Sequence, residues 1–229
     1  MKFSTKNWIP PEISLPDQIK DFPVDARGAN WMGKDLRNLD LRGANLCRAD
    51  LRGANLSGCR IDNTDMRLAK YDNLTKIPEG FNICTSGAIG PGAQLNGAFL
   101  NNADLRAVDL RKSSLMGAYL SGADLSGAIL DNVSMAGADL RNSILRGAMC
   151  RGTRFGTSEL NMADLRGADL TGADLENLES IKGCDFSMCE GMDSQIERLL
   201  ERSALELDHW NPLTRSTTRT SLISLKKTT

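Results

Sequence analysis

Residues 44–58 read ANLCRADLRGANLSG, which is three consecutive five-residue units. Each has Leu at its centre and Ala two positions earlier, and two of the three have Gly two positions after the centre. The pattern continues for ten units over 24–73 and for 17 units over 93–177. Leu is central in 19 of these 27 units, and Gly or Asn stands two positions later in 21. Such regularity is typical of a repeat protein.

A period of five residues fits neither an α-helix of 3.6 residues per turn nor a flat strand of period two. It fits a short extended segment followed by a turn, because Gly and Asn readily adopt the positive φ of a corner. Residues two apart in an extended segment point to the same side. The central Leu and the preceding Ala are therefore predicted to fill the interior, with structural core residues Leu46, Leu51, Leu105, Leu125, Leu145 and Leu165.

The repeated A(D/N)LxG pattern resembles the pentapeptide-repeat family, whose members are abundant in cyanobacteria. The resemblance implies an all-β solenoid, a right-handed quadrilateral parallel β-helix with four units in each coil. It also implies that residues 20 apart are stacked on one another. The composition agrees with such a core, because the chain has 31 Leu and 21 Ala but only 3 Val.

The segments outside the regular repeats divide the chain further. Residues 1–23 are predicted to form an N-terminal cap, and 74–92 an excursion loop between repeat array 1 (24–73) and repeat array 2 (93–190). Phe81 and Ile83 could instead fold this loop back as packing. The register slips by one residue after Leu175, which indicates a bulge. Residues 191–210 are predicted to form a C-terminal α-helix, and the Ser-, Thr- and Lys-rich residues 211–229 a disordered tail.

The apolar stripe of that helix, Ile196, Leu199, Leu200 and Leu207, is expected to cover the last coil or to make a homodimer contact. The chain would then be a monomer or a homodimer through an end cap. No run of about 20 apolar residues and no signal-like segment occurs, so we expect a cytoplasmic protein that does not enter a membrane.

Composition excludes several classes of function. The chain has 28 basic and 29 acidic residues, a net charge of -1 and a single His, so neither direct nucleic-acid binding through bulk charge nor a multi-His site is expected. The six cysteines lack paired zinc-type spacing, and no catalytic sequence motif is present. We therefore expect no enzyme activity, no catalytic residues, no metal and no cofactor.

Five of the outward positions just before a unit centre carry large apolar residues, namely Phe99, Tyr119, Ile129, Ile144 and Met149. Stacking at 20 residues would place Phe99 beside Tyr119 and Ile129 beside Met149, on opposite faces. Arg146 and Arg151 border the second cluster. Exposed apolar side chains rimmed by Arg are typical of a protein-contact surface. The alternative is that the chain's own loop or termini cover them.

The function predicted from these features is a non-catalytic repeat scaffold that presents its faces to an unidentified protein partner, in a regulatory role. The resemblance implies one alternative, a DNA mimic that modulates DNA gyrase. Mimicry of phosphates requires a strongly negative surface. Residues 24–73 have a net charge of +2 and residues 93–190 of -4, which disfavours that alternative.

Overall fold

The computed structural model describes residues 23–226. The chain forms two compact units, unit 1 (Met1–Ala93) and unit 2 (Gln94–Thr229), and each is described here by itself. The predicted N-terminal cap falls almost entirely on residues 1–22, which lie outside the described residues.

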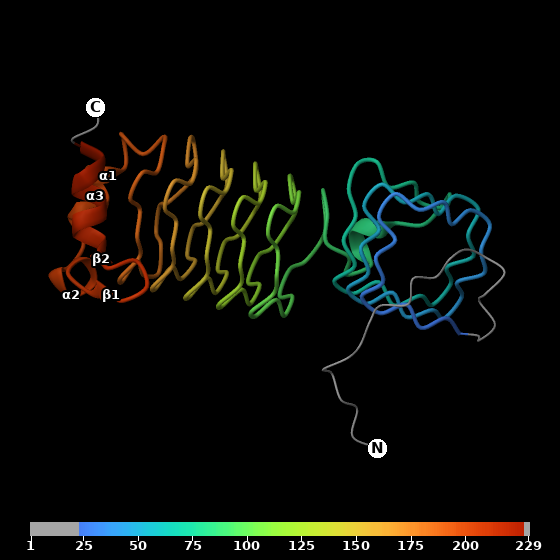
Figure 1. The fold of residues 1–229 in the computed structure, drawn as a ribbon. Helices are drawn as coiled ribbons and strands as arrows, with labels where there is room; N and C mark the ends of the chain where they lie inside the picture. Colours follow the sequence, from blue (N-terminus) through green and yellow to red (C-terminus); the bar gives the residue numbers. More distant parts are fainter. Residues whose placement is uncertain (1–22, 227–229) are drawn as a thin grey trace, which may run out of the picture. The chain divides into compact units, whose positions relative to one another are not determined.

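Unit 2 is a stack of coils held together by parallel bridges between residues 20 apart. Four series of bridges begin at Gln94, Phe99, Asp104 and Asp109, so each coil has four sides of five residues. On each side the central N–H donates to the next coil, as Leu105 does to the carbonyl of Asp124 at 2.8 Å. The N–H of Asp124 donates back to the carbonyl of Ala103. These repeated rungs form the stacked loops of Figure 1.

The corners have the left-handed backbone that the repeat predicts. The φ angle is +67° at Gly53 and +55° at Asn102, as expected for these residue types. It is also positive where the sequence has neither Gly nor Asn, with +62° at Leu68 and +61° at Met162. The Leu68 N–H donates to the carbonyl of Gly87 at 2.8 Å, so hydrogen bonds between coils impose the corner even on an unfavourable residue.

The interior of each unit is the predicted column of Leu and Ala. All six predicted core residues are at most 1% exposed, namely Leu46, Leu51, Leu105, Leu125, Leu145 and Leu165. Ala44 and Ala49, two positions before a centre, are also fully buried. Large and small side chains therefore alternate along a narrow interior, which explains why Val is rare.

Residues 74–92 fold back onto unit 1. Lys76 pairs with Asn55 and Ile89 with Lys70, so both ends of the segment continue the ladder. Between them lies the short 3-10 helix η3 (Ile83–Thr85), and Ile77 and Phe81 pack against the buried core. The segment serves as packing, which was the alternative to a free excursion.

The predicted bulge after Leu175 is also present. Arg154 pairs with Asp174, 20 residues on, whereas Glu159 pairs with Ser180, 21 residues on. The one extra residue shifts all later bridges of unit 2 to the longer spacing.

The C-terminal region differs from the prediction in two ways. In place of one helix over 191–210 there are two, α1 (Ile196–Leu200) and α2 (Ala204–Leu207). Residues 211–226, predicted to be disordered, are ordered. They contain β1 (Trp210–Asn211, starting one residue earlier), its antiparallel partner β2 (Ser216–Thr217), and α3 (Thr218–Lys226). Figure 1 shows these elements gathered at the end of the last coil of unit 2.

Polar contacts with the coil edge explain both corrections. Ser203 has extended φ and ψ and separates the two helices, which allows Glu206 of α2 to accept a hydrogen bond from the N–H of Ile181 at 2.6 Å. Thr218 of α3 donates its hydroxyl to the Ile181 carbonyl at 2.9 Å. Ile196, Leu199 and Leu207 are buried as predicted, whereas Leu200 is only half-buried. Hydrophobic periodicity alone does not reveal these polar contacts.

No helix within residues 23–226 is both long enough and apolar enough to cross a membrane.

Candidate protein-contact surfaces

Nine outward aspartates are each paired with an arginine of the same five-residue unit. In the unit centred on Leu41, Arg42 donates from Nε and Nη2 to the Asp40 carboxylate at 2.9 and 2.7 Å. The Arg42 N–H also donates to Asp40 Oδ1 at 3.3 Å. This arginine holds the pKa of Asp40 at about 2, below its ordinary value of 3.8. The same D-x-R pairing occurs at Asp25–Arg27, Asp35–Arg37, Asp50–Arg52, Asp65–Arg67, Asp104–Arg106, Asp109–Arg111, Asp139–Arg141 and Asp164–Arg166.

The pairing changes where an apolar residue replaces the outward acid. Ile144 and Met149 stand at that position, so Arg146 and Arg151 have no carboxylate in their own units. Arg146 instead reaches Asp164 of the next coil, and Arg151 reaches Asp169, both at 2.5 Å. The two predicted rim arginines therefore belong to ion pairs between coils.

Asp164 lies at the centre of the first of these networks and is almost fully buried. Burial by itself raises its pKa, but hydrogen bonds from Arg166 and Arg146 outweigh that effect and the net pKa is lowered. The carboxylate is therefore held in its charged form between two guanidinium groups.

The Ile129 cluster has the predicted arrangement. Ile129 pairs with Met149, and Ile144 occupies the neighbouring side of the same coil as Met149. Ile129 and Ile144 are half-buried and Met149 is 41% exposed. The cluster is a small apolar patch bordered by ion pairs.

The Phe99–Tyr119 pair is much more exposed. The two rings are stacked, with centroids 4.9 Å apart and planes inclined by 4°. Phe99 is 77% exposed and Tyr119 is 44% exposed. The column that they begin continues with the charged residues Asp139 and Glu159. Within residues 94–226 of unit 2, no other segment covers the stacked rings to any large extent, so the C-terminal elements of the chain do not hide them.

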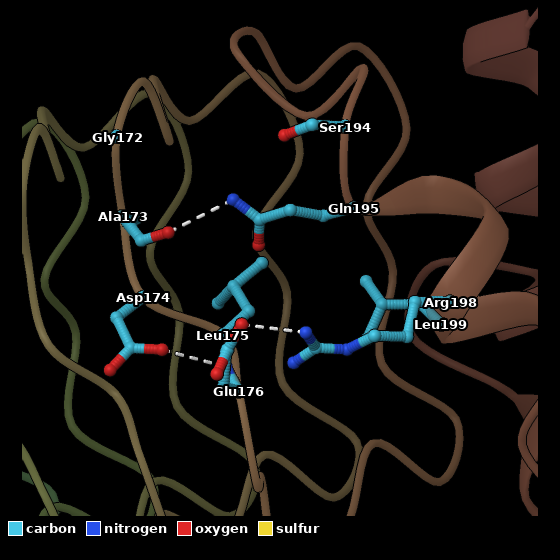
Figure 2. Close-up of a pocket in the computed structure, with 9 residues that line it drawn as sticks. All are labelled: Gly172, Ala173, Asp174, Leu175, Glu176, Ser194, Gln195, Arg198 and Leu199. Carbon is cyan, nitrogen blue, oxygen red and sulfur yellow. Dashed lines mark hydrogen bonds and ion pairs between the residues drawn. The ribbon is translucent and has the colours of Figure 1, made fainter.

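A hollow of about 410 Å³ lies between the last coil and α1, and sequence reasoning missed it (Figure 2). Its lining comes from Gly172–Glu176 on the coil and from Ser194, Gln195, Arg198 and Leu199. The side-chain amide of Gln195 donates to the Ala173 carbonyl at 2.9 Å, and Arg198 pairs with Glu176 at 2.6 Å. The bulge after Leu175 was the one sequence signal close to this site.

Within 23–226, no group of three or more His, Cys, Asp or Glu side chains is placed to hold a metal ion. Cys59, Cys150, Cys184 and Cys189 are buried in the coils. Burial raises the pKa of the Cys189 thiol to about 12, which makes it a poor nucleophile near neutral pH.

The family model for pentapeptide repeats matches eight copies, over residues 35–67, 92–122, 115–147 and 148–179, which is more than half of the chain. The chain belongs to the pentapeptide-repeat family. The four-sided parallel ladder of this pentapeptide-repeat protein is thus the right-handed quadrilateral β-helix of that family. The comparisons indicate no catalytic family, and no curated protein matches the chain.

Solved structures of other pentapeptide-repeat proteins resemble the chain. One comes from the Arabidopsis thaliana thylakoid lumen, with 29% identity, a TM-score of 0.40, and coverage of 58% of this chain and 89% of that one. HetL of Nostoc sp. strain PCC 7120, involved in heterocyst differentiation regulation, has 24% identity, a TM-score of 0.24, and coverage of 72% and 90%. QnrB1, a plasmid-mediated fluoroquinolone resistance protein, has 17% identity, a TM-score of 0.44, and coverage of 73% and 79%.

Proposed function

We propose that this chain is a non-catalytic scaffold that binds another protein through outward apolar side chains of unit 2. The observation that carries the proposal is the exposed Phe99–Tyr119 stack. Aromatic rings left in water forfeit the free energy of burial, and such rings are enriched among the residues that dominate protein–protein binding. The stack also holds the two rings in one fixed geometry, so little side-chain entropy remains to be lost on binding.

The Ile129 cluster supports the same function on the opposite face. Its apolar side chains are bordered by Arg146–Asp164 and Arg151–Asp169, whose charges are already paired. An apolar centre with a satisfied polar rim is the usual composition of a protein interface.

Replacing both rings, Phe99→Ser with Tyr119→Ser, is expected to lower recovery of the partner in affinity capture from the source cell by about thirtyfold, the loss typical of an aromatic hot spot. The matched control is Met188→Ser, because Met188 is 72% exposed but lies outside both clusters. The control should capture the same proteins as the unmodified chain. A double variant with unchanged circular dichroism and unchanged capture would contradict the role of the stack.

A second double variant, Ile129→Asp with Met149→Asp, tests the opposite face in the same assay. Loss of the partner from this variant alone would place the contact at the Ile129 cluster. If both double variants retain every captured protein, the scaffold proposal is wrong for unit 2.

The alternative, a DNA mimic acting on gyrase, is disfavoured by the arrangement of charges. A phosphate-like surface needs unpaired negative charge, whereas the outward Asp residues here are bound by Arg at 2.5–2.9 Å in nine units. We expect micromolar protein to leave DNA supercoiling by gyrase unchanged. Inhibition or protection of gyrase at that concentration would favour the alternative instead.

A further inference from the structure

One side of the last coil in unit 2, residues 173–177, has an open hydrogen-bonding edge. In the coil before it, Phe155 donates its N–H to the Asp174 carbonyl at 2.9 Å, and Thr157 donates to the Asn177 carbonyl at 3.0 Å. The equivalent donors on the last coil are the N–H groups of Leu175 and Asn177. Neither has an acceptor among residues 23–226. An unpaired edge of this kind is a template for another strand.

The neighbouring sides of this coil are closed by the C-terminal elements. Glu206 of α2 accepts from the Ile181 N–H at 2.6 Å, and Ser221 of α3 accepts from the Phe186 N–H at 3.1 Å. Asn211 of β1 donates its side-chain amide to the Gly183 carbonyl at 2.8 Å. The edge at Leu175 therefore differs from its neighbours, which are capped by polar side chains.

The hollow beside α1 lies against this open edge (Figure 2). The carbonyl of Thr153, in the coil before, accepts a hydrogen bond from the N–H of Asp174 at 2.8 Å. One coil later, the side-chain amide of Gln195 donates to the Ala173 carbonyl at 2.9 Å. Gln195 thus replaces one hydrogen bond of an absent strand, while the hollow, which Leu175 lines, leaves room for a backbone carbonyl to accept from the Leu175 N–H.

The charges around the hollow favour a basic ligand. Its lining has two carboxylates, Asp174 and Glu176, and one guanidinium, Arg198. Arg198 is paired with Glu176 at 2.6 Å. The Asp174 carboxylate accepts the Glu176 N–H at 2.8 Å but forms no ion pair with any described residue. A lysine or arginine beside Asp174 would supply that missing cation.

We propose that this hollow binds an extended segment of a partner protein by strand addition to the Leu175 edge, with a basic side chain beside Asp174. Its carbonyls accept from the N–H groups of Leu175 and Asn177, as the carbonyls of the last coil do for the coil before. The basic side chain stacks outward in the Asp174 column, because outward residues of successive coils lie above one another. The site is separate from the Phe99–Tyr119 stack and does not depend on it.

The test uses the full chain and two blocked heptapeptides, acetyl-ATVKVTA-amide and acetyl-ATVEVTA-amide, whose central residues differ in charge. Amide hydrogen exchange is followed by NMR. The Lys peptide at saturation is expected to slow exchange at Leu175 and Asn177 at least tenfold, because both protons become hydrogen-bonded. The Glu peptide should bind about fivefold more weakly, the size of one partly exposed charge pair.

Three variants make the result specific. Asp174→Asn should remove the preference for the Lys peptide, whereas Asp131→Asn, which changes an acid without an ion pair elsewhere in unit 2, should keep it. Ser194→Trp should fill the hollow and abolish binding, with circular dichroism unchanged. The proposal is overturned if the Lys peptide does not slow amide exchange at Leu175, or if Ser194→Trp binds that peptide normally. It is also overturned if protection of Leu175 rises with protein concentration in the absence of peptide, because a second copy of the chain would then be the occupant.

Discussion

Replacing Leu125 with aspartate is expected to unfold the coils of unit 2. Leu125 is fully buried, and the peptide group that joins it to Asp124 takes part in rungs on both sides. Its N–H, from Leu125, donates to the Ile144 carbonyl, and its carbonyl, from Asp124, accepts from the Leu105 N–H. A carboxylate at this position would have no cation or hydrogen-bond donor from the apolar column. Burying it costs several kcal/mol, a large part of the roughly 5–15 kcal/mol that stabilises a domain.

Far-UV circular dichroism and thermal unfolding measure this effect. The matched control is Ile129→Asp, which introduces the same charge four residues later at an outward, half-buried position. We expect Ile129→Asp to keep the native spectrum and a cooperative transition, while Leu125→Asp loses both. Cooperative, native-like melting of Leu125→Asp would mean that the inward and outward positions of the repeat have been assigned the wrong way round.

The coil was predictable from the sequence because each five-residue unit contains its own determinants. The spacing from Ala44 to Leu46 sets the inward face, and the glycine at position 53 permits the corner. Leu68 and Met162 show the limit of such local reasoning. Both adopt a left-handed corner that disfavours them by about 1–2 kcal/mol, because hydrogen bonds between coils determine the backbone there.

The candidate site was predictable only in part. Stacking at 20 residues correctly placed Phe99 beside Tyr119 and Ile129 beside Met149. It gave no information on exposure, because what covers a column depends on segments without a repeat. The pairing of Arg146 with the next coil could have been inferred from the absence of an acid in its own unit.

The C-terminal region had no comparable signal. Its order depends on single polar contacts such as Glu206 with the Ile181 N–H, which connect residues 25 apart with no period. A Ser-, Thr- and Lys-rich composition suggests disorder, yet here the hydroxyl groups of Thr218 and Ser221 are buried partners of the coil edge. The hollow beside Gln195 follows from the same geometry and was missed for the same reason.

Lowering the pH from about 5 to 2 is expected to destabilise the coils progressively. Hydrogen bonds from Arg lower the pKa of Asp25, Asp35 and Asp65 in the folded chain. Those from Arg42 hold the pKa of Asp40 at about 2, against an ordinary 3.8. Between these values the unfolded chain binds more protons than the folded chain, so stability rises with pH. The stabilisation is complete above pH 4 to 5 and is lost as the pH falls through about 2.

Urea unfolding at a series of pH values measures this dependence, and single substitutions show its origin. Asp40→Asn should make the stability of unit 1 less dependent on pH, because it removes a carboxylate bound by both Arg42 and Arg60. Asp62→Asn, which removes an exposed acid of the same unit that makes no ion pair with a described residue, should have a smaller effect. Since the pairs are exposed, 1 M salt should weaken the dependence by screening. A stability that stays constant from pH 5 to pH 2 would mean that the D-x-R pairs contribute little, and the regular charge pattern would then serve solubility or binding instead of the fold.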